Sequence, residues 1–286
     1  MIINVQPGVF RKFDPTVSKL PVIVDVSRSG REYPPDFRSP IPFTVLHDNV
    51  SMYVEEIWSA APQVGATMLY ALFPNTYIDA NRNELDLDAD LIDGEWPVPL
   101  KPTISLRGLG LLKSKSRYGE PMQERKLKVS EIMERLDKYH RPYHAELGRI
   151  IASMKSSFGF VYQLSCHCMS AIGAPTHPDP GKERSDFCLG NVSGKTSTEE
   201  FIGFVAETIR ALGFTCSVNE PYNGGELNTR YGDPANGIES IMIEINKKRF
   251  MDTKTFRKTE GYEEIHAAAT KVLSAVALRA QKRIAG

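Results

Sequence analysis

The sequence has few cysteines and no excess of charge of either sign. Four cysteines occur in 286 residues, which does not indicate a disulfide framework in a chain of this length. Lys plus Arg and Asp plus Glu each number 35, so the net charge favours neither nucleic acid nor an anionic membrane as a partner. No apolar run reaches the roughly 20 residues of a membrane span, and the first residues show no secretory signal. We therefore expect a cytoplasmic protein with reduced thiols.

Phosphate-binding glycine motifs are also missing, since neither GxGxxG nor GxxxxGK[ST] occurs in the chain. What the chain does contain is an alternation of β-branched runs with amphipathic stretches. It predicts strands at 20–26, 66–73, 160–166, 214–219 and 240–246, and helices at 48–62, 129–159 (with a break at Pro142), 197–213 and 260–283. We expect one α/β domain, residues 1–286, whose sheet is covered on both faces. Most of its long loops follow strands, where ligands bind in such sheets.

The stretch "VYQLSCHCMS" (161–170) ends an apolar strand with a histidine between two cysteines. Because successive side chains of a strand point to opposite faces, Cys166 and Cys168 share one face and His167 takes the other. A single metal ion therefore cannot bind all three, and the spacing fits no common zinc-finger pattern. His167 alone is a candidate site residue, with a buried histidine bonded to a backbone carbonyl as the alternative.

A second candidate is Glu244, in the apolar strand "MIEIN" (242–246). If Ile243 and Ile245 face the core, Glu244 lies on the opposite face. Charged side chains are seldom buried without a partner. Glu244 is therefore either exposed at a polar edge or held in a cleft with a raised pKa, which suits general acid–base catalysis.

Two loops add candidates for binding. The acidic stretch "YIDANRNELDLDADLIDG" (77–94) contains Arg82, whose planar fork can bind a substrate carboxylate, although the stretch is alternatively a solvated turn. The loop "NEPYNGGELNTRYGDPANG" (219–237) carries Tyr222 and Arg230 beside a pair of glycines that favour a tight turn or a close backbone approach.

In this order, eight segments resemble the N-formylglutamate amidohydrolase family, distant relatives of the zinc carboxypeptidases, from about Leu20 to about Met251. They are "SRSGREYP" (27–34), "VEEIW" (54–58), "YIDANR" (77–82), "RPYHAEL" (141–147), "SCHCM" (165–169), "DFCLG" (186–190), "NEPYNGG" (219–225) and "IEINKKRFMD" (243–252). The resemblance implies a three-layer α/β/α sandwich with a mixed, mostly parallel sheet. It also implies a hydrolase that cleaves N-formyl or N-acyl amino acids through a zinc-bound water, with a role in histidine degradation.

By the same resemblance, His167 corresponds to a zinc ligand and Glu244 to the acid that deprotonates the attacking water. Asn81 and Arg82 correspond to a pair that binds the substrate's α-carboxylate. These residue types suit the chemistry, because a zinc-bound water has a pKa near 7 and needs a carboxylate within hydrogen-bonding distance.

The chain departs from the family's metal motif at two positions. Where the family has the histidine of "HSG", a zinc ligand, this chain has Arg28, and arginine cannot coordinate a cation. An expected acid before "VEEIW" is Ser51. His47 and Asp48, just upstream, are candidate substitute ligands, and an ordinary helix cap is the alternative for this pair.

Two hypotheses follow from these residues. The first is an amidohydrolase of N-acyl amino acids that uses zinc bound by His167, His47 and Asp48. The second is a metal-free protein that binds a small carboxylate or dicarboxylate through Arg28 and Arg82 without turnover. Neither involves nucleic acid or a membrane, and the sequence does not specify the oligomeric state.

Overall fold

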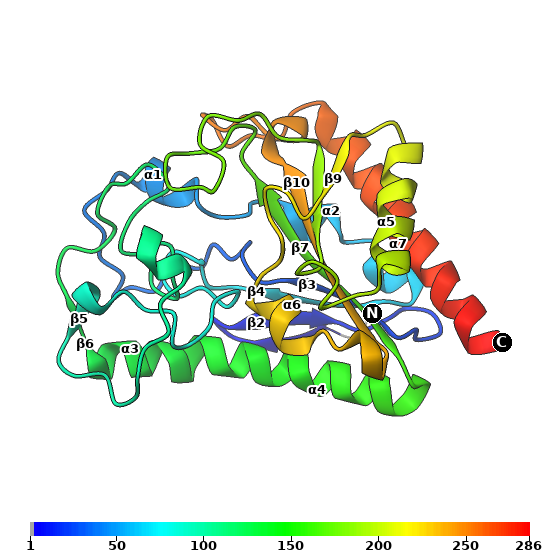
Figure 1. Ribbon diagram of the computed structural model, residues 1–286, viewed down its shortest axis with the longest axis horizontal. Coiled ribbons are helices and arrows are strands. Elements are labelled where there is room, and N and C mark those ends of the chain that lie inside the picture. Colours follow the sequence, from blue (N-terminus) through cyan, green and yellow to red (C-terminus); the bar gives the residue numbers. More distant parts are fainter. Residues whose placement is uncertain (1–2) are drawn as a thin grey trace.

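The computed structural model describes residues 3–286, and its centre is an eight-stranded sheet in the order β1-β2-β4-β3-β7-β10-β8-β9 (Figure 1). The strands are β1 (Ile3–Gln6), β2 (Phe10–Phe13), β3 (Val22–Val26), β4 (Thr67–Ala71), β7 (Val161–Met169), β8 (Phe187–Gly190), β9 (Cys216–Val218) and β10 (Ile238–Asn246). A separate small pair consists of β5 (Ile92–Asp93) and β6 (Leu127–Lys128).

The helices are α1 (Phe43–His47), α2 (Val54–Ile57), α3 (Val129–Arg135), α4 (Arg141–Phe158), α5 (Glu199–Ala211), α6 (Glu226–Tyr231) and α7 (Gly261–Ala285). A π-helical turn, Leu136–His140, joins α3 to α4, with Pro142 in the first turn of α4, so the predicted break is confirmed. Within residues 3–286, no helix combines the length and the apolar character that crossing a membrane requires.

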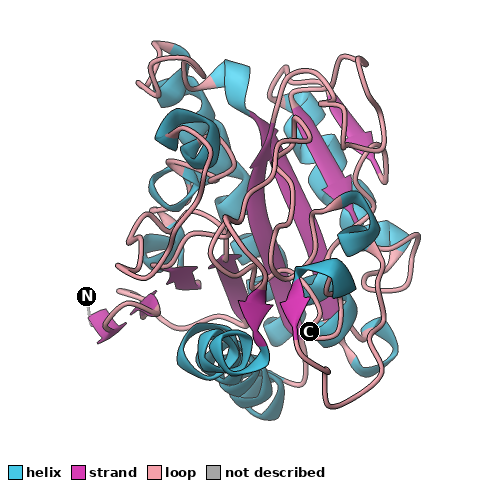
Figure 2. Ribbon diagram, turned by 90° about the vertical axis from the view of Figure 1, so that its left-hand side faces the viewer, coloured by secondary structure: helices cyan, strands magenta, loops and turns pink. Residues whose placement is uncertain are grey.

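The four central strands, β4, β3, β7 and β10, run parallel, whereas β1 and β2 pair antiparallel with their neighbours. Strand β8 pairs antiparallel with β10 and parallel with β9. Side chains of the central strands are buried on both faces, as is typical of parallel strands between helices. The predicted fold class, an α/β protein with a mixed, mostly parallel sheet between helical layers, is confirmed (Figure 2).

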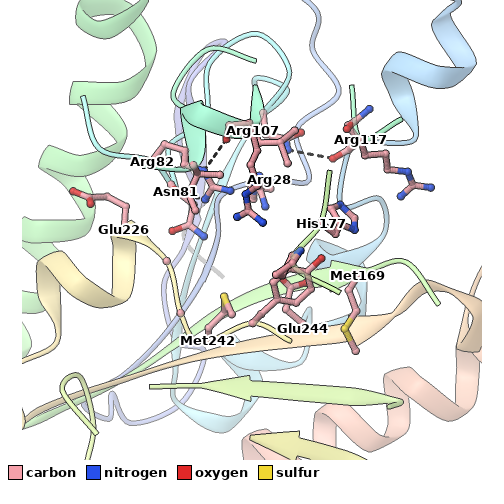
Figure 3. A pocket seen from close by; sticks show the side chains of 18 of the residues that line it. Arg28, Asn81, Arg82, Arg107, Arg117, Met169, His177, Glu226, Met242 and Glu244 are labelled. Atoms are coloured by element: carbon pink, nitrogen blue, oxygen red, sulfur yellow. Dashed lines mark hydrogen bonds between the residues drawn. The ribbon is translucent and has the colours of Figure 1, made fainter. Parts of the chain in front are cut away.

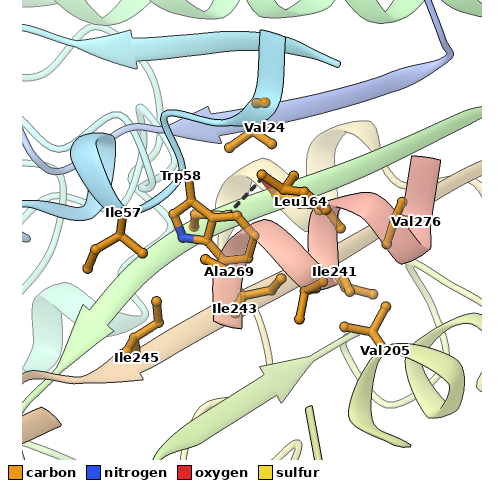
Figure 4. Packing of buried hydrophobic residues seen from close by; sticks show 14 of the residues in the cluster. Val24, Ile57, Trp58, Leu164, Val205, Ile241, Ile243, Ile245, Ala269 and Val276 are labelled. Carbon is orange, nitrogen blue, oxygen red and sulfur yellow. Dashed lines mark hydrogen bonds between the residues drawn. The ribbon is translucent and has the colours of Figure 1, made fainter. Parts of the chain in front are cut away.

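Each face of the sheet has its own hydrophobic core. On one face, α2, α5 and α7 pack against Val24, Leu164 and three isoleucines of β10, with Trp58 fully buried among them (Figure 4). On the other face, α3 and α4 cover Ile23, Leu69 and Val161. Because Ile241, Ile243 and Ile245 all face the α5–α7 core, the alternate β10 residues point to the opposite side.

Some predicted elements are wrong. Of the single helix predicted at 48–62, only the short α2 and the start of a 3₁₀ turn (Ala61–Val64) form, because the backbone of Tyr53 adopts a left-handed conformation with φ of 67° directly before α2. Asp48 follows α1 instead of capping a helix start. No element was predicted for the segments that form the β1–β2 hairpin, β8 and α6. The N-cap of α5 is Thr198, whose side chain accepts a hydrogen bond from the Phe201 amide.

Replacing Ile243 by alanine should destabilise the protein by about 2–5 kcal/mol, because the fully buried side chain leaves a cavity between β10 and the α5–α7 layer. Urea unfolding followed by circular dichroism measures this change. The control is Ile284→Ala in the last turn of α7, where the side chain is 47% exposed and the expected change stays within about 0.5 kcal/mol. Equal losses in both variants would contradict the assigned register of β10.

Candidate active site

A cavity of about 660 Å³ opens where β3, β4, β7 and β10 end. Its lining includes Arg28 after β3, residues 75 and 81–83 after β4, Cys168 and Met169 of β7, and Met242 and Glu244 of β10. In Figure 3, Arg28, Asn81 and Arg82 lie together on one side of the cavity and Glu244 lies on the other. The strand ends thus bring together residues that are far apart in the sequence, as expected for an open α/β sheet.

Glu244 is only 5% exposed, and its Oε2 has no hydrogen-bond partner among residues 3–286. Burial raises the pKa of this carboxyl to about 7, against the opposing charges of Arg28, Arg184, Arg82 and Lys247. A carboxyl group with this pKa can accept and return a proton near neutral pH. Its position opposite the isoleucine face is the one that the alternation in β10 predicted.

His167 pairs with Glu244 across the parallel strands β7 and β10 and is fully buried. Its Nε2 lies 3.3 Å from Asn81 Nδ2 and 3.1 Å from Ser165 Oγ. Burial, followed by the charge of Arg28, lowers the pKa of the imidazole to about 3, so the ring is neutral. Cys166 faces the opposite core, as predicted from the strand geometry.

Arg28 is held by a buried carboxylate. Its Nη2 donates to Asp79 Oδ2 at 2.5 Å, and Lys113 Nζ donates to the same oxygen at 2.8 Å. Burial disfavours the ionised Asp79, but the charges of Arg28, Lys113 and Arg82 hold the pKa of this carboxyl far below its usual range. Burial lowers the pKa of Lys113 to about 7, although Asp79 opposes this change. The Asp79 carboxylate therefore pairs with Arg28 and Lys113 and lies within the influence of Arg82. The site carries an excess of positive charge.

Arg82 and Asn81, the predicted carboxylate-binding pair, differ in which side-chain N–H groups they leave for a ligand. Arg82 donates from Nε to the Leu109 carbonyl at 2.9 Å and from Nη1 to the Asn81 carbonyl at 2.7 Å, which leaves Nη2 for a ligand. Asn81 accepts from the Leu227 amide through Oδ1 at 3.1 Å and faces His167 through Nδ2. The amide of Asn81 thus retains one N–H for a ligand.

The glycine-rich loop places its two predicted residues differently. Tyr222 lines the cavity, with the Arg184 guanidinium 4.8 Å from its ring centre, and burial raises the pKa of its hydroxyl. Arg230 lies outside the cavity, on α6, beside a separate groove formed with Lys155 and Asp233. Gly225 is needed for close packing, because a Cβ there would lie 2.4 Å from Asn81 Oδ1.

The residues do not fit the expected zinc site. Nδ1 of His47 bonds to the Tyr33 hydroxyl at 3.0 Å, and its ring stacks on Phe43 away from the cavity. Asp48 lines the cavity, but its carboxylate is paired with Arg117 and Lys247. No cluster of three or more His, Cys, Asp or Glu side chains suited to a metal occurs in residues 3–286. The charge of Arg28 also acts on His167. The expected zinc ligands His167, His47 and Asp48 therefore do not come together around one site.

The sequence reasoning missed Asp25, Asp79 and Lys113. Asp25 is fully buried in β3, where burial raises the pKa of its carboxyl to about 7 while Gln163 and Ser165 donate to it. An acid within the apolar strand "VIVDV" is the same signal that identified Glu244, whereas Asp79 lies in the loop after β4 and carries no such signal. Lys113 carries no such signal, because it lies in an irregular segment.

Fold and site together define an α/β protein with an enzyme-like cavity that is rich in basic side chains. The model of the N-formylglutamate amidohydrolase family matches residues 20–251, and the chain belongs to this family. An N-formylglutamate deformylase of Pseudomonas putida is 27% identical over 228 residues, which are 77% of this chain and 76% of that protein. A solved structure of N-formylglutamate amidohydrolase from Ralstonia eutropha JMP134 is 32% identical, with a TM-score of 0.90 over 96% of this chain and 99% of that one.

The fold extends to a more distant protein. The structure of a gene product from Agrobacterium tumefaciens, 16% identical, has a TM-score of 0.64 over 94% of this chain and 95% of that one. At this identity the likeness concerns the fold alone.

Replacing Asp79 by asparagine should destabilise the protein by about 3–5 kcal/mol, because the change leaves buried basic groups without their counter-ion. Thermal and urea unfolding measure the loss. Asp90→Asn, at an exposed position, is the control and should change the free energy of unfolding by less than about 0.5 kcal/mol. A D79N variant as stable as the control would show that Asp79 does not hold these cations.

Proposed function

We propose that the protein hydrolyses the amide bond of an N-formyl or other N-acyl amino acid with an acidic side chain, such as N-formylglutamate. The observation that carries this proposal is a buried carboxyl group, Glu244, with a pKa of about 7 in a cavity rich in basic side chains. Family membership supports the reaction type.

Basic side chains are available at two places for the two carboxylates of such a substrate. Arg82, with the remaining N–H of Asn81, binds the α-carboxylate. Lys101 and Arg107 line the outer part of the cavity, and neither side chain forms a hydrogen bond or ion pair within residues 3–286. They bind the side-chain carboxylate. Tyr222, whose ring is held beside Arg184, closes another part of the wall.

Glu244 removes a proton from the attacking water and later returns it to the leaving amine. This double role requires a pKa near the working pH, which burial provides here. The His, Cys, Asp and Glu side chains of residues 3–286 do not fit zinc, so the proposed proton transfers use Glu244 alone. The competing function is binding of a dicarboxylate without turnover, which the Arg28 charge at the family's metal-ligand position favours.

Glu244→Gln should lower kcat for N-formylglutamate by about 10²–10⁴-fold, because glutamine cannot transfer the proton. In the wild type, Glu244 becomes protonated below its pKa of about 7, so kcat/KM should fall about tenfold per pH unit below that value. Release of formate measures both effects. The control is Glu183→Gln, an exposed position outside the cavity. Undiminished turnover in E244Q would remove Glu244 from the reaction, whereas a wild type that binds the substrate without turnover would favour the competing function.

Arg82→Met should raise the Kd of glutarate by about 10-fold or more and leave that of the neutral glutaramide nearly unchanged. The reason is that one charge-assisted contact to a carboxylate contributes about 1.5–3 kcal/mol. Calorimetric titration measures both ligands. Arg125→Met, an exposed site whose side chain pairs with Glu131, is the control. Equal losses for acid and amide would indicate that Arg82 only shapes the loop.

A further inference from the structure

Two buried histidines lie against the loop that carries Asn81 and Arg82. His140 is the last residue of the π-helical turn before α4, and His144 lies in the first turn of α4. His140 is fully buried and His144 is 4% exposed. Their ring centres are 4.3 Å apart, so both rings point to the same side of the helix. Neither ring lines the cavity. They therefore act on a ligand only through residues that do line it.

Each histidine donates a hydrogen bond to a backbone carbonyl next to Asn81. Nε2 of His144 lies 2.8 Å from the Ala80 carbonyl oxygen, and Nε2 of His140 lies 3.0 Å from the Arg82 carbonyl oxygen. Because a carbonyl oxygen can only accept, each Nε2 carries a proton, whatever the state of Nδ1. Burial lowers the pKa of His144 to about 3, so this ring donates as a neutral imidazole.

The carbonyl between these two is also bonded to a side chain. Arg82 Nη1 donates to the Asn81 carbonyl at 2.7 Å. The three consecutive carbonyls of residues 80–82 thus each accept from a histidine or arginine. The Asn81 backbone amide in turn donates to Asp79 Oδ1 at 3.0 Å, and the Leu227 amide donates to Asn81 Oδ1. These contacts determine the conformation of a segment that belongs to no helix or strand.

We propose that His140 and His144 are positioning residues, which hold the backbone of Asn81 and Arg82 so that the remaining N–H groups of this pair face the substrate's α-carboxylate. The inference rests on the proposed function, in which the pair binds that carboxylate. Arg82 presents Nη2 to a ligand while its Nε and Nη1 are bonded to the carbonyls of Leu109 and Asn81. Those two bonds depend on the backbone position that the histidines hold.

The helix gives the two histidines a rigid support. Tyr143 and Leu147 of α4 are fully buried in the core on this face of the sheet. From α6, the Tyr231 ring stacks on His144 with ring centres 5.9 Å apart, and its hydroxyl donates to the His144 carbonyl at 2.8 Å. His140 belongs to a π-helical turn, a feature that is frequent at functional sites. Donors held in place before binding lose less entropy when the ligand arrives, so the support increases affinity.

The test removes one donor at a time. His140→Leu and His144→Leu should each raise the Kd of glutarate about 3–10-fold, the effect of one hydrogen bond, and leave that of the neutral glutaramide nearly unchanged. Calorimetric titration measures both ligands. The glutamine variants H140Q and H144Q should bind glutarate nearly as tightly as the wild type, because the glutamine amide donates from close to the position of Nε2. In hydrolysis of N-formylglutamate, the leucine variants should raise KM by the same factor and leave kcat nearly unchanged.

His266→Leu is the matched control. Nδ1 of His266 lies 3.0 Å from the Ile57 carbonyl oxygen, so this variant also removes a histidine–carbonyl contact, but on α7 and away from the cavity. It should lower the midpoint of urea unfolding and leave the Kd of glutarate unchanged. Leucine variants of His140 and His144 that bind glutarate as tightly as H266L would overturn the proposal, as would glutamine variants that lose as much affinity as the leucine ones. If a leucine variant does not fold, methionine at the same position replaces it, with the same expected and contradicting results.

The binding and turnover measurements separate this inference from the proposed function. A wild type that binds glutarate but releases no formate from N-formylglutamate would overturn the proposed hydrolysis, while the Kd values still decide on the histidines. A wild type that binds no glutarate would overturn both.

Discussion

The site depends on one buried carboxylate, that of Asp79, shared by Arg28 and Lys113 with Arg82 close enough to act on it. A single negative charge does not balance this group of bases. The remaining positive charge of these bases favours an anionic ligand, as the proposed substrate is. Burial, together with the charge of Arg28, lowers the pKa of His167, and the same charge opposes the rise that burial causes in the pKa of Glu244. The charge around Asp79 therefore affects the pKa values of the site and explains its preference for an anionic ligand.

The sheet makes this arrangement possible. Parallel strands β3, β4, β7 and β10 end at the same edge, so Arg28, the 79–82 segment, His167 and Glu244 come together although they span most of the chain. Packing against the backbone then fixes the loops. A Cβ on Gly30 would lie 2.1 Å from the Phe73 carbonyl, which shows how tightly the Arg28 loop lies against the end of β4. Gly225 serves the same purpose for α6 and Asn81.

Much of this could be predicted from the sequence, and the reasons are specific. Apolar runs located the central strands, and the alternation in β10 placed Glu244 opposite its isoleucines. The short elements could not be predicted, because α1, α2 and α6 depend on tertiary contacts rather than on their own periodicity. The separation of His47 from the cavity also had no local signal, since it follows from the contact with Tyr33. The roles of Glu244, Arg82 and His167 remain predictions.

The absence of a suitable ligand set changes how the family resemblance applies to this chain. Arg28 stands where the resemblance places a zinc ligand, and its guanidinium brings a fixed positive charge that no change in pH removes. The most direct test is a crystal structure of the Glu244→Gln variant with N-formylglutamate. The account predicts the α-carboxylate on Arg82 and the scissile amide beside residue 244. A substrate bound elsewhere, or a metal ion on His167, would contradict it.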